Sequence, residues 1–211
     1  MSGGRSTTRA TLFDHGAGNL HSLAKALEAV GARVSIEADP VRSLATDLLV
    51  IPGVGAFGAA SEQLAPGRDA MRAALAGGLP CLGVCLGMQL LFDGSDEGPG
   101  RGLGLIPGRV RGLRSERVPH MGWNDVDPVP GTAAFAWPAT AYFAHGFVCE
   151  PLEPACVAAW TTHEHDRFPA AVRVANTLGV QFHPEKSGRA GLAMLAAWLD
   201  VVRAGEVWPC S

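Results

Sequence analysis

The sequence has little charge and no apolar run long enough to cross a membrane. Charged residues make up 18% of the 211 residues, and hydrophobic residues make up 47%. This composition excludes an intrinsically disordered chain and gives no membrane-spanning helix. The formal net charge of −3 provides no general attraction to nucleic acid. The length is that of one α/β domain with a substantial core.

Paired cysteines are also missing. The five cysteines are odd in number and scattered, and they form no C-x-x-C pair: Cys81, Cys85, Cys149, Cys156 and Cys210. This pattern argues against a disulfide framework and predicts a reducing, cytoplasmic location. Residues 1–9 lack the apolar core of a signal peptide, so we expect a disordered N-terminal extension there. Residues 10–211 contain no linker or repeat and are predicted to form a single domain.

Strands and helices alternate in the first half of the chain. Hydrophobic patterning predicts strands at residues 10–13, 33–36, 47–51 and 80–84. Helices are expected at residues 20–30 and 57–76, the second of which Pro66 and Gly67 can interrupt. In the second half, short strands are expected at residues 109–113, 141–148, 156–160, 170–174 and 178–182, before a last helix at residues 188–203. The predicted fold is α/β, with a mainly parallel central sheet, helices on both faces and added antiparallel strands in the C-terminal half.

One stretch carries the strongest chemical signal. Gly83-Val84-Cys85-Leu86-Gly87 places a cysteine between two glycines where the strand ends. A helix is expected over residues 86–92. A nucleophile at such a tight strand-to-helix turn forms an elbow, and the helix N-terminus favours the reactive thiolate. The alternative interpretation is one more buried cysteine, the commoner fate of this residue type.

A second stretch near the C-terminus supplies a candidate base. His183-Pro184-Glu185 directly follows the last predicted strand. A histidine can take the proton of a thiol and later return it, and it needs an acceptor that fixes its tautomer. In an extended chain, Glu185 would lie on the same side as His183. Taken alone, the three residues could equally form a surface turn.

Together, the two stretches resemble the class I (triad) glutamine amidotransferases. The similarity extends over nearly the whole chain after residue 9. The resemblance implies that Cys85 attacks the side-chain amide of glutamine and releases ammonia from a glutamyl thioester. It also implies that His183 acts as acid and base, with Glu185 as its partner. No metal or other cofactor is implied.

Four further stretches resemble the glutaminase subunits of imidazole glycerol phosphate synthases, in histidine biosynthesis. They are residues 16–20, 52–57 and 119–124, and the extension of the His-Pro-Glu motif by Lys186-Ser187. This resemblance implies a heterodimer with a (β/α)₈-barrel cyclase subunit. The ammonia would pass to that partner, which makes imidazole glycerol phosphate and aminoimidazole carboxamide ribonucleotide.

The resemblance assigns roles to individual residues. It implies an oxyanion hole formed by Gly53, Val54 and Leu86. It implies glutamine binding by Gly55, Gln89, Glu97, His145, Gly146 and Phe147. It implies contacts with the cyclase by Asn19, Met121, Trp123, Asn124 and Lys186. Without the resemblance, Asn19 is a helix cap, Trp123 a core aromatic, Lys186 a solvated charge, Gln89 a surface helix residue and Glu97 a loop acid.

Two departures from the family pattern concern the pocket. His15 stands where an aromatic residue such as tyrosine is common, and Gly146-Phe147 replaces a more usual hydroxyl-bearing pair. His163-Glu164-His165 resembles a metal-binding pair, but a hairpin tip fits better because no further ligands cluster nearby.

Three rival functions share parts of the pattern. An amidotransferase for another acceptor, in the purine, anthranilate or pyridoxal phosphate pathways, is disfavoured by Lys186-Ser187 and the stretch around Trp123. A silent interaction subunit is disfavoured by the intact Cys85, His183 and Glu185. A cysteine peptidase or esterase is disfavoured by the spacing of His183 and Glu185 and by Gln89.

Overall fold

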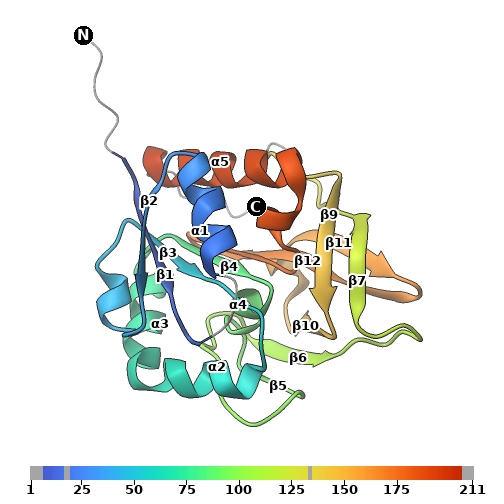
Figure 1. The fold of residues 1–211 in the computed structure, drawn as a ribbon. Helices are drawn as coiled ribbons and strands as arrows, with labels where there is room; N and C mark the ends of the chain where they lie inside the picture. Colours follow the sequence, from blue (N-terminus) through green and yellow to red (C-terminus); the bar gives the residue numbers. More distant parts are fainter. Residues whose placement is uncertain (1–6, 17–19, 133–134, 206–211) are drawn as a thin grey trace.

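A large twisted sheet forms the centre of the molecule (Figure 1). The computed structural model describes residues 7–16, 20–132 and 135–205. The sheet contains β1 (Arg9–Phe13), β2 (Arg33–Glu37), β3 (Leu48–Ile51), β4 (Cys81–Val84), β8 (Asp127–Pro128), β11 (Val157–His163), β12 (Asp166–Val174) and β13 (Thr177–Val180). Their order is β2-β1-β3-β4-β13-β12-β11-β8.

The sheet changes from parallel to antiparallel across its width. Neighbouring strands run parallel from β2 to β13, and the pairs from β13 to β8 are antiparallel. This arrangement confirms the predicted fold class. The first strand begins at Arg9, one residue before the predicted start of the domain. Residues 1–6, which make up most of the predicted disordered extension, lie outside the described part of the chain.

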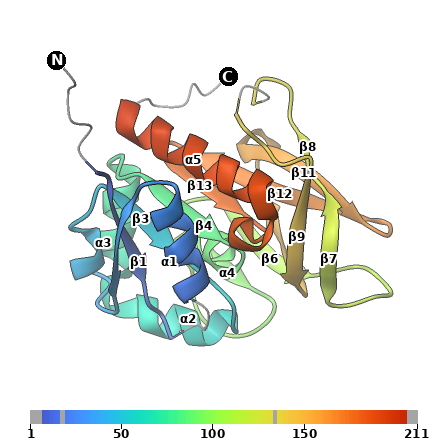
Figure 2. The same cartoon turned by 45° about the horizontal axis from the view of Figure 1, so that its top comes forward.

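Helices cover both faces of the sheet (Figures 1 and 2). They are α1 (Leu20–Ala29), α2 (Phe57–Leu64), α3 (Arg68–Ala76), α4 (Leu86–Gln89) and α5 (Gly188–Ala204), with short 3₁₀ turns η1 (Arg42–Leu44), η2 (Ala65–Gly67), η3 (Pro154–Cys156) and η4 (Pro184–Lys186). One buried cluster joins α1 and α5 to the sheet, and a second joins α2 and α3 to its other face.

The alternation of side chains in β3 explains why this strand is apolar throughout. Leu48 and Val50 pack in the cluster with α1 and α5, whereas Leu49 and Ile51 pack in the cluster with α2 and α3. Because successive side chains point to opposite faces, a strand covered on both faces needs apolar residues at every position.

Two small sheets complete the fold. One has the order β10-β6-β5, formed by β5 (Gly94–Ser95), β6 (Gly108–Gly112) and β10 (Phe147–Pro151). The other pairs β7 (His120–Asp125) with β9 (Thr140–His145) in antiparallel register. This pair stands beside the central sheet in Figure 1 and contributes to the site described below.

Several predicted elements differ from the observed ones. The helix expected over residues 86–92 ends at Gln89, after a single turn. The strand expected over residues 141–148 is two strands of different sheets, β9 and β10, separated by Gly146. The helical region expected over residues 57–76 is interrupted where predicted, by η2 at Ala65–Gly67. His163-Glu164-His165 lies at the turn between β11 and β12, as predicted, with Glu164 at a φ of 56°.

No helix in the described ranges is both long and apolar enough to span a bilayer.

Candidate active site

Cys85 lies at a strained turn between β4 and α4. Its backbone angles are φ 52° and ψ −105°, a region that non-glycine residues rarely adopt. The glycines on either side are required by close packing. A Cβ atom on Gly87 would lie 1.8 Å from the Ile51 carbonyl oxygen, and one on Gly83 would lie 2.8 Å from the Gly87 carbonyl. The structure therefore has the elbow geometry that the sequence predicted.

The neighbouring strand carries the candidate base to the same edge of the sheet. β13 runs parallel to β4 with Val180 opposite Val84, and the Cys85 N–H donates to the Val180 carbonyl at 2.7 Å. The carboxyl ends of parallel strands share one edge, so His183 arrives beside the elbow. Its backbone N–H donates to the Tyr142 carbonyl at 2.8 Å, which fixes the chain at this point.

His183 is paired with Glu185. The His183 Nδ1 to Glu185 Oε1 distance is 2.8 Å, and both side chains are almost completely buried. The expectation of an extended chain here was wrong, because Pro184–Lys186 forms the 3₁₀ turn η4. The turn still brings the carboxylate to the ring. Ser187 closes the turn by donating from its Oγ to the His183 carbonyl at 2.7 Å.

The surroundings of His183 favour its charged form. Burial lowers the pKa of His183, but the Cys85 sulfur and the Glu185 carboxylate outweigh it and raise the pKa from 6.5 to about 9. The second ring nitrogen, Nε2, is buried and has no hydrogen-bond partner among the described residues. That nitrogen can therefore exchange a proton with a neighbouring sulfur or substrate atom.

A cavity of about 300 Å³ opens beside the sulfur. Its lining includes every residue predicted for the oxyanion hole and for glutamine binding: Gly53, Val54, Gly55, Leu86, Gln89, Glu97, His145, Gly146 and Phe147. Pro119 and Met121 form part of its wall. Gln89 is not the surface residue that its helix position alone would suggest, because its Nε2 donates to the Phe147 carbonyl at 3.0 Å and its side chain is buried.

The predicted oxyanion segment follows β3. Ile51 lies opposite Gly83 in the sheet, which places Gly53 and Val54 next to the elbow. The side chain of His15 is buried, and its Nε2 donates to the Pro52 carbonyl at 2.6 Å. Glu97 accepts from the Phe57 N–H at 2.8 Å. Through its bond to Pro52, His15, which departs from the family pattern, contacts the oxyanion segment directly.

Three of the predicted partner residues, Met121, Trp123 and Lys186, form one exposed surface next to the cavity. Met121 is 65% exposed and Trp123 is 59% exposed, so Trp123 is not a core aromatic. The Trp123 ring meets Tyr142 edge-on, and the Lys186 ammonium lies 5.9 Å from the same Tyr142 ring. Asn124, on the same strand as Trp123, is half-buried, and its amide bonds to His120 and to the Thr162 carbonyl. Asn19 lies outside the described residues.

Sequence reasoning assigned no role to three buried polar residues at this site. Gln181 is fully buried, and its Nε2 donates to the Cys85 sulfur at 3.5 Å. His120 is buried beside His145, and Ser187 holds η4. The available signal was a polar residue inside the apolar run Val180-Gln181-Phe182, because buried polar side chains are retained where they have partners.

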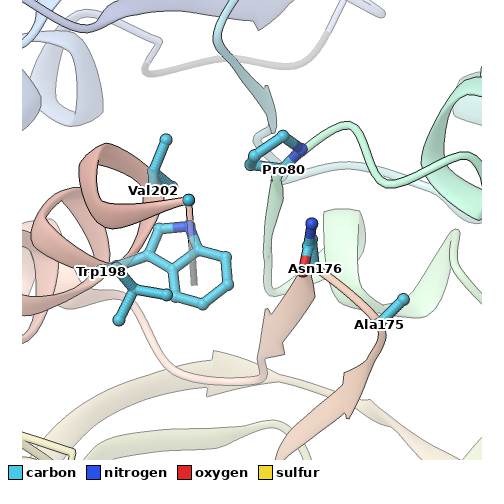
Figure 3. A pocket seen from close by; sticks show the side chains of 7 residues that line it. Pro80, Ala175, Asn176, Trp198 and Val202 are labelled. Atoms are coloured by element: carbon cyan, nitrogen blue, oxygen red, sulfur yellow. The ribbon is translucent and has the colours of Figure 1, made fainter. Parts of the chain in front are cut away.

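A second, much smaller cavity lies at the opposite end of the sheet (Figure 3). Pro80 and Asn176 precede β4 and β13, and Trp198 and Val202 of α5 close the space. Its volume of about 20 Å³ is close to the room that one water molecule needs. The larger cavity, with the candidate active-site residues, lies at the carboxyl edge of the strands. The described residues contain no group of three or more potential metal ligands.

Comparison with known proteins identifies similar chains. A family model described as "Glutamine amidotransferase class-I" matches residues 11–200. The "Imidazole glycerol phosphate synthase subunit HisH" of Thermus thermophilus is 47% identical, over 89% of this chain and 95% of that protein. The protein of the same description from Synechococcus elongatus is 41% identical, over 96% of this chain and 97% of its own length.

Solved structures with lower identity share the fold. A chain described as a glutamine amidotransferase superposes with a TM-score of 0.71 at 17% identity, covering 92% of this chain and 98% of that one. The glutaminase domain of a Trypanosoma brucei CTPS with bound acivicin gives a TM-score of 0.63 at 19% identity, covering 97% of each chain. At these identities the likeness concerns the fold alone.

Proposed function

The chain belongs to the class-I glutamine amidotransferases and, within them, to the family of HisH subunits, and from this membership we propose how its site works and which partner it serves. It is an enzyme with glutaminase activity that functions in histidine biosynthesis as a subunit of imidazole glycerol phosphate synthase. The roles of individual residues, the transfer of ammonia and the composition of the complex are the proposal.

Cys85 is the nucleophile of this proposal. The sulfur attacks the side-chain amide carbon of glutamine, and the C–N bond then breaks. His183 donates the proton that the leaving ammonia needs. The observation that supports this assignment best is the meeting, at one edge of the sheet, of the Cys85 elbow with the buried His183–Glu185 pair. A pKa of about 9 keeps His183 protonated at neutral pH, ready to act as this acid.

Water then attacks the resulting glutamyl thioester. His183, which is neutral after protonating ammonia, takes a proton from that water, and the C–S bond breaks to release glutamate and the thiolate. Glu185 holds the ring through Nδ1 and leaves Nε2 for both proton transfers. The N–H groups of Val54 and Leu86 are assigned to the oxyanion in each step, since both residues line the cavity.

A cyclase subunit is the proposed partner, in a cytoplasmic heterodimer. The exposed surface of Met121, Trp123 and Lys186 directly borders the cavity, which is where released ammonia would leave. A cyclase seated on this surface would receive ammonia without loss to solvent and use it in the lyase reaction that forms imidazole glycerol phosphate.

The test is the complex of this chain with the organism's cyclase, as wild type and as Cys85→Ala. We expect the variant to lose glutamine-dependent glutamate release by at least about 10³-fold, because the covalent route is gone. With ammonium salt in place of glutamine, it should still form imidazole glycerol phosphate. Retained glutaminase activity would remove Cys85 from the role of nucleophile.

A further inference from the structure

We propose that one chain of hydrogen bonds positions both the glutamine pocket and a donor to the nucleophile, an inference that rests on the proposed function. The chain runs from strand β7 to the sulfur of Cys85. Its members are Asn124, His120, His145, Phe147, Gln89 and Gln181. His120 and Gln181 act in it as positioning residues.

The histidine half of the chain begins at a backbone carbonyl. His145 Nδ1 lies 3.0 Å from the Phe147 carbonyl oxygen, and His145 Nε2 lies 3.1 Å from Nδ1 of His120. A carbonyl only accepts, so Nδ1 of His145 carries the hydrogen. Burial, with the neighbouring His120, lowers the pKa of His145 to about 3, so the ring is neutral and its Nε2 is an acceptor.

The same reasoning fixes the tautomer of His120, the next ring in the chain. His120 must donate from Nδ1 to His145. Burial, with the neighbouring His163, lowers the pKa of His120 to about 4, which leaves its Nε2 as an acceptor. The Asn124 amide, 3.3 Å from this atom, fills that position. The other hydrogen of the amide goes to the Thr162 carbonyl at 2.9 Å. Every donor in this half therefore points from β7 toward the pocket.

The glutamine half continues from the same carbonyl. Gln89 Nε2 donates to the Phe147 carbonyl at 3.0 Å and lies 3.4 Å from Oε1 of Gln181. With its oxygen engaged by Gln89, Gln181 presents its Nε2 to the Cys85 sulfur at 3.5 Å. A hydrogen bond to a charged group is worth more than one to a neutral group, so this donor favours the thiolate over the thiol.

The two ends of the chain differ in exposure. Gln181 is completely buried, and His120 is buried between Phe143 and His163, with ring centroids at 4.9 and 4.1 Å. Asn124 follows the exposed Trp123 in β7 but is itself half-buried, with its amide bonded to His120 and to the Thr162 carbonyl. A partner that contacts β7 at Trp123 would therefore sit next to the half-buried end of this chain, and a displacement of Asn124 would reach the pocket carbonyl.

Histidine tautomers give a test that needs no activity. In the ¹⁵N-labelled protein, long-range imidazole correlations should show both His145 and His120 as neutral rings protonated at Nδ1 at pH 7. Protonation of either ring at Nε2 instead would overturn the histidine half. If the wild-type complex released no glutamate, the proposed function would fail, while this spectrum would still decide the tautomers.

Kinetic measurements on the cyclase complex test whether His120 influences glutamine binding and the reactivity of Cys85. His120→Phe keeps a stacked ring but removes both nitrogens. It should raise KM for glutamine and slow iodoacetamide alkylation of Cys85 at pH 7, each by about three- to tenfold. His120→Asn, which restores a donor near the position of Nδ1, should recover most of the loss. The matched control is His163→Phe, which changes the other ring of the stacked pair and should alter both quantities by less than about twofold.

The double variant distinguishes one chain from two unrelated contacts. Gln181→Leu should slow the alkylation of Cys85 by about tenfold. If His120 and Gln181 act through one chain, the double variant should be slower than wild type by less than the product of the two single effects. Multiplicative effects would overturn the proposal. Equal losses in His120→Phe and His163→Phe, in step with their melting temperatures, would also overturn it, because His120 would then only pack.

Discussion

At the scale of single residues, the site depends on side chains that are costly to bury. His183 and Glu185 are almost inaccessible, and the pair is tolerated because each satisfies the other. The pKa of His183 stays raised, to about 9, although burial by itself lowers it, because the sulfur and the carboxylate both favour the charged ring. The position of these two partners therefore decides the protonation state of the base.

Glu185→Gln tests this dependence. Removing one of the two groups that raise the pKa of His183 should move it below about 9, as measured by an NMR titration of the ring. The pKa of His183 is higher in the folded protein, at about 9, than the value of 6.5 expected for the unfolded chain. The charged ring therefore stabilises the fold fully below pH 6.5, and this stabilisation is lost as the pH rises through about 9. The variant should therefore be less stable than wild type at pH 6, and the difference should shrink by pH 9.5.

Activity measurements should distinguish the roles of His183 and Glu185. His183→Asn should reduce single-turnover acylation more than Glu185→Gln does, because the ring moves the proton and the carboxylate orients the ring. Equal losses, or a larger loss in Glu185→Gln, would show that Glu185 does more than orient.

At the scale of elements, a buried ion pair joins the small sheet to the central one. Arg111 of β6 contacts Asp166 of β12 through two hydrogen bonds, of 2.7 and 2.8 Å, and their side chains are 10% and 6% exposed. Burial opposes ionisation of Asp166, but Arg111 and the Arg114 N–H hold its pKa below the usual value. The pair positions the sheet that carries the Phe147 end of β10.

Asp166→Ala should destabilise the protein by about 3–5 kcal/mol, because among the described residues it leaves a largely buried guanidinium with only the exposed Glu150 as ionic partner. The matched control is Asp96→Ala, which removes the exposed ion pair with Arg109 and should cost at most about 1 kcal/mol. Urea unfolding of both variants measures the two values. Similar values for both would mean that the buried pair does not hold the sheets together.

At the scale of the whole molecule, the cavity and the exposed surface face the same way. Met121 belongs to both, since it lines the cavity and is largely exposed. A partner seated on this surface would lie within reach of the oxyanion segment that follows β3. This arrangement allows the presence of the cyclase to control whether glutamine is hydrolysed.

We therefore expect the isolated chain to be a poor glutaminase, and the cyclase with its ligand to increase the rate by about 10²–10³-fold, the usual contribution of one oxyanion donor. Steady-state glutamate release by the chain alone, by the complex, and by the complex with cyclase ligand measures this. Val54→Pro removes the N–H assigned to the oxyanion, so a variant that still folds and binds should lose the stimulation. If the isolated chain already runs at the full rate, the segment is a preformed oxyanion hole.

The sequence by itself determined the elements and the chemistry. Four apolar residues in β3 required cover on both faces, and Gly83 and Gly87 around Cys85 allowed a turn that other residues could not form. The motif around His183 indicated the base. These properties depend on neighbouring residues, whose steric and hydrophobic constraints act locally, and so they can be predicted without the rest of the fold.

Only the tertiary structure decided which distant residues meet. The register that sets Val180 opposite Val84 brings Gln181 to a sulfur 96 residues away, and the pairing of β7 with β9 sets His120 opposite His145. The exposure of Trp123 and the division of the predicted strand at Gly146 were likewise outcomes of packing. A one-residue shift in register would turn each side chain to the other face, and the register is fixed by the packing of all the layers together.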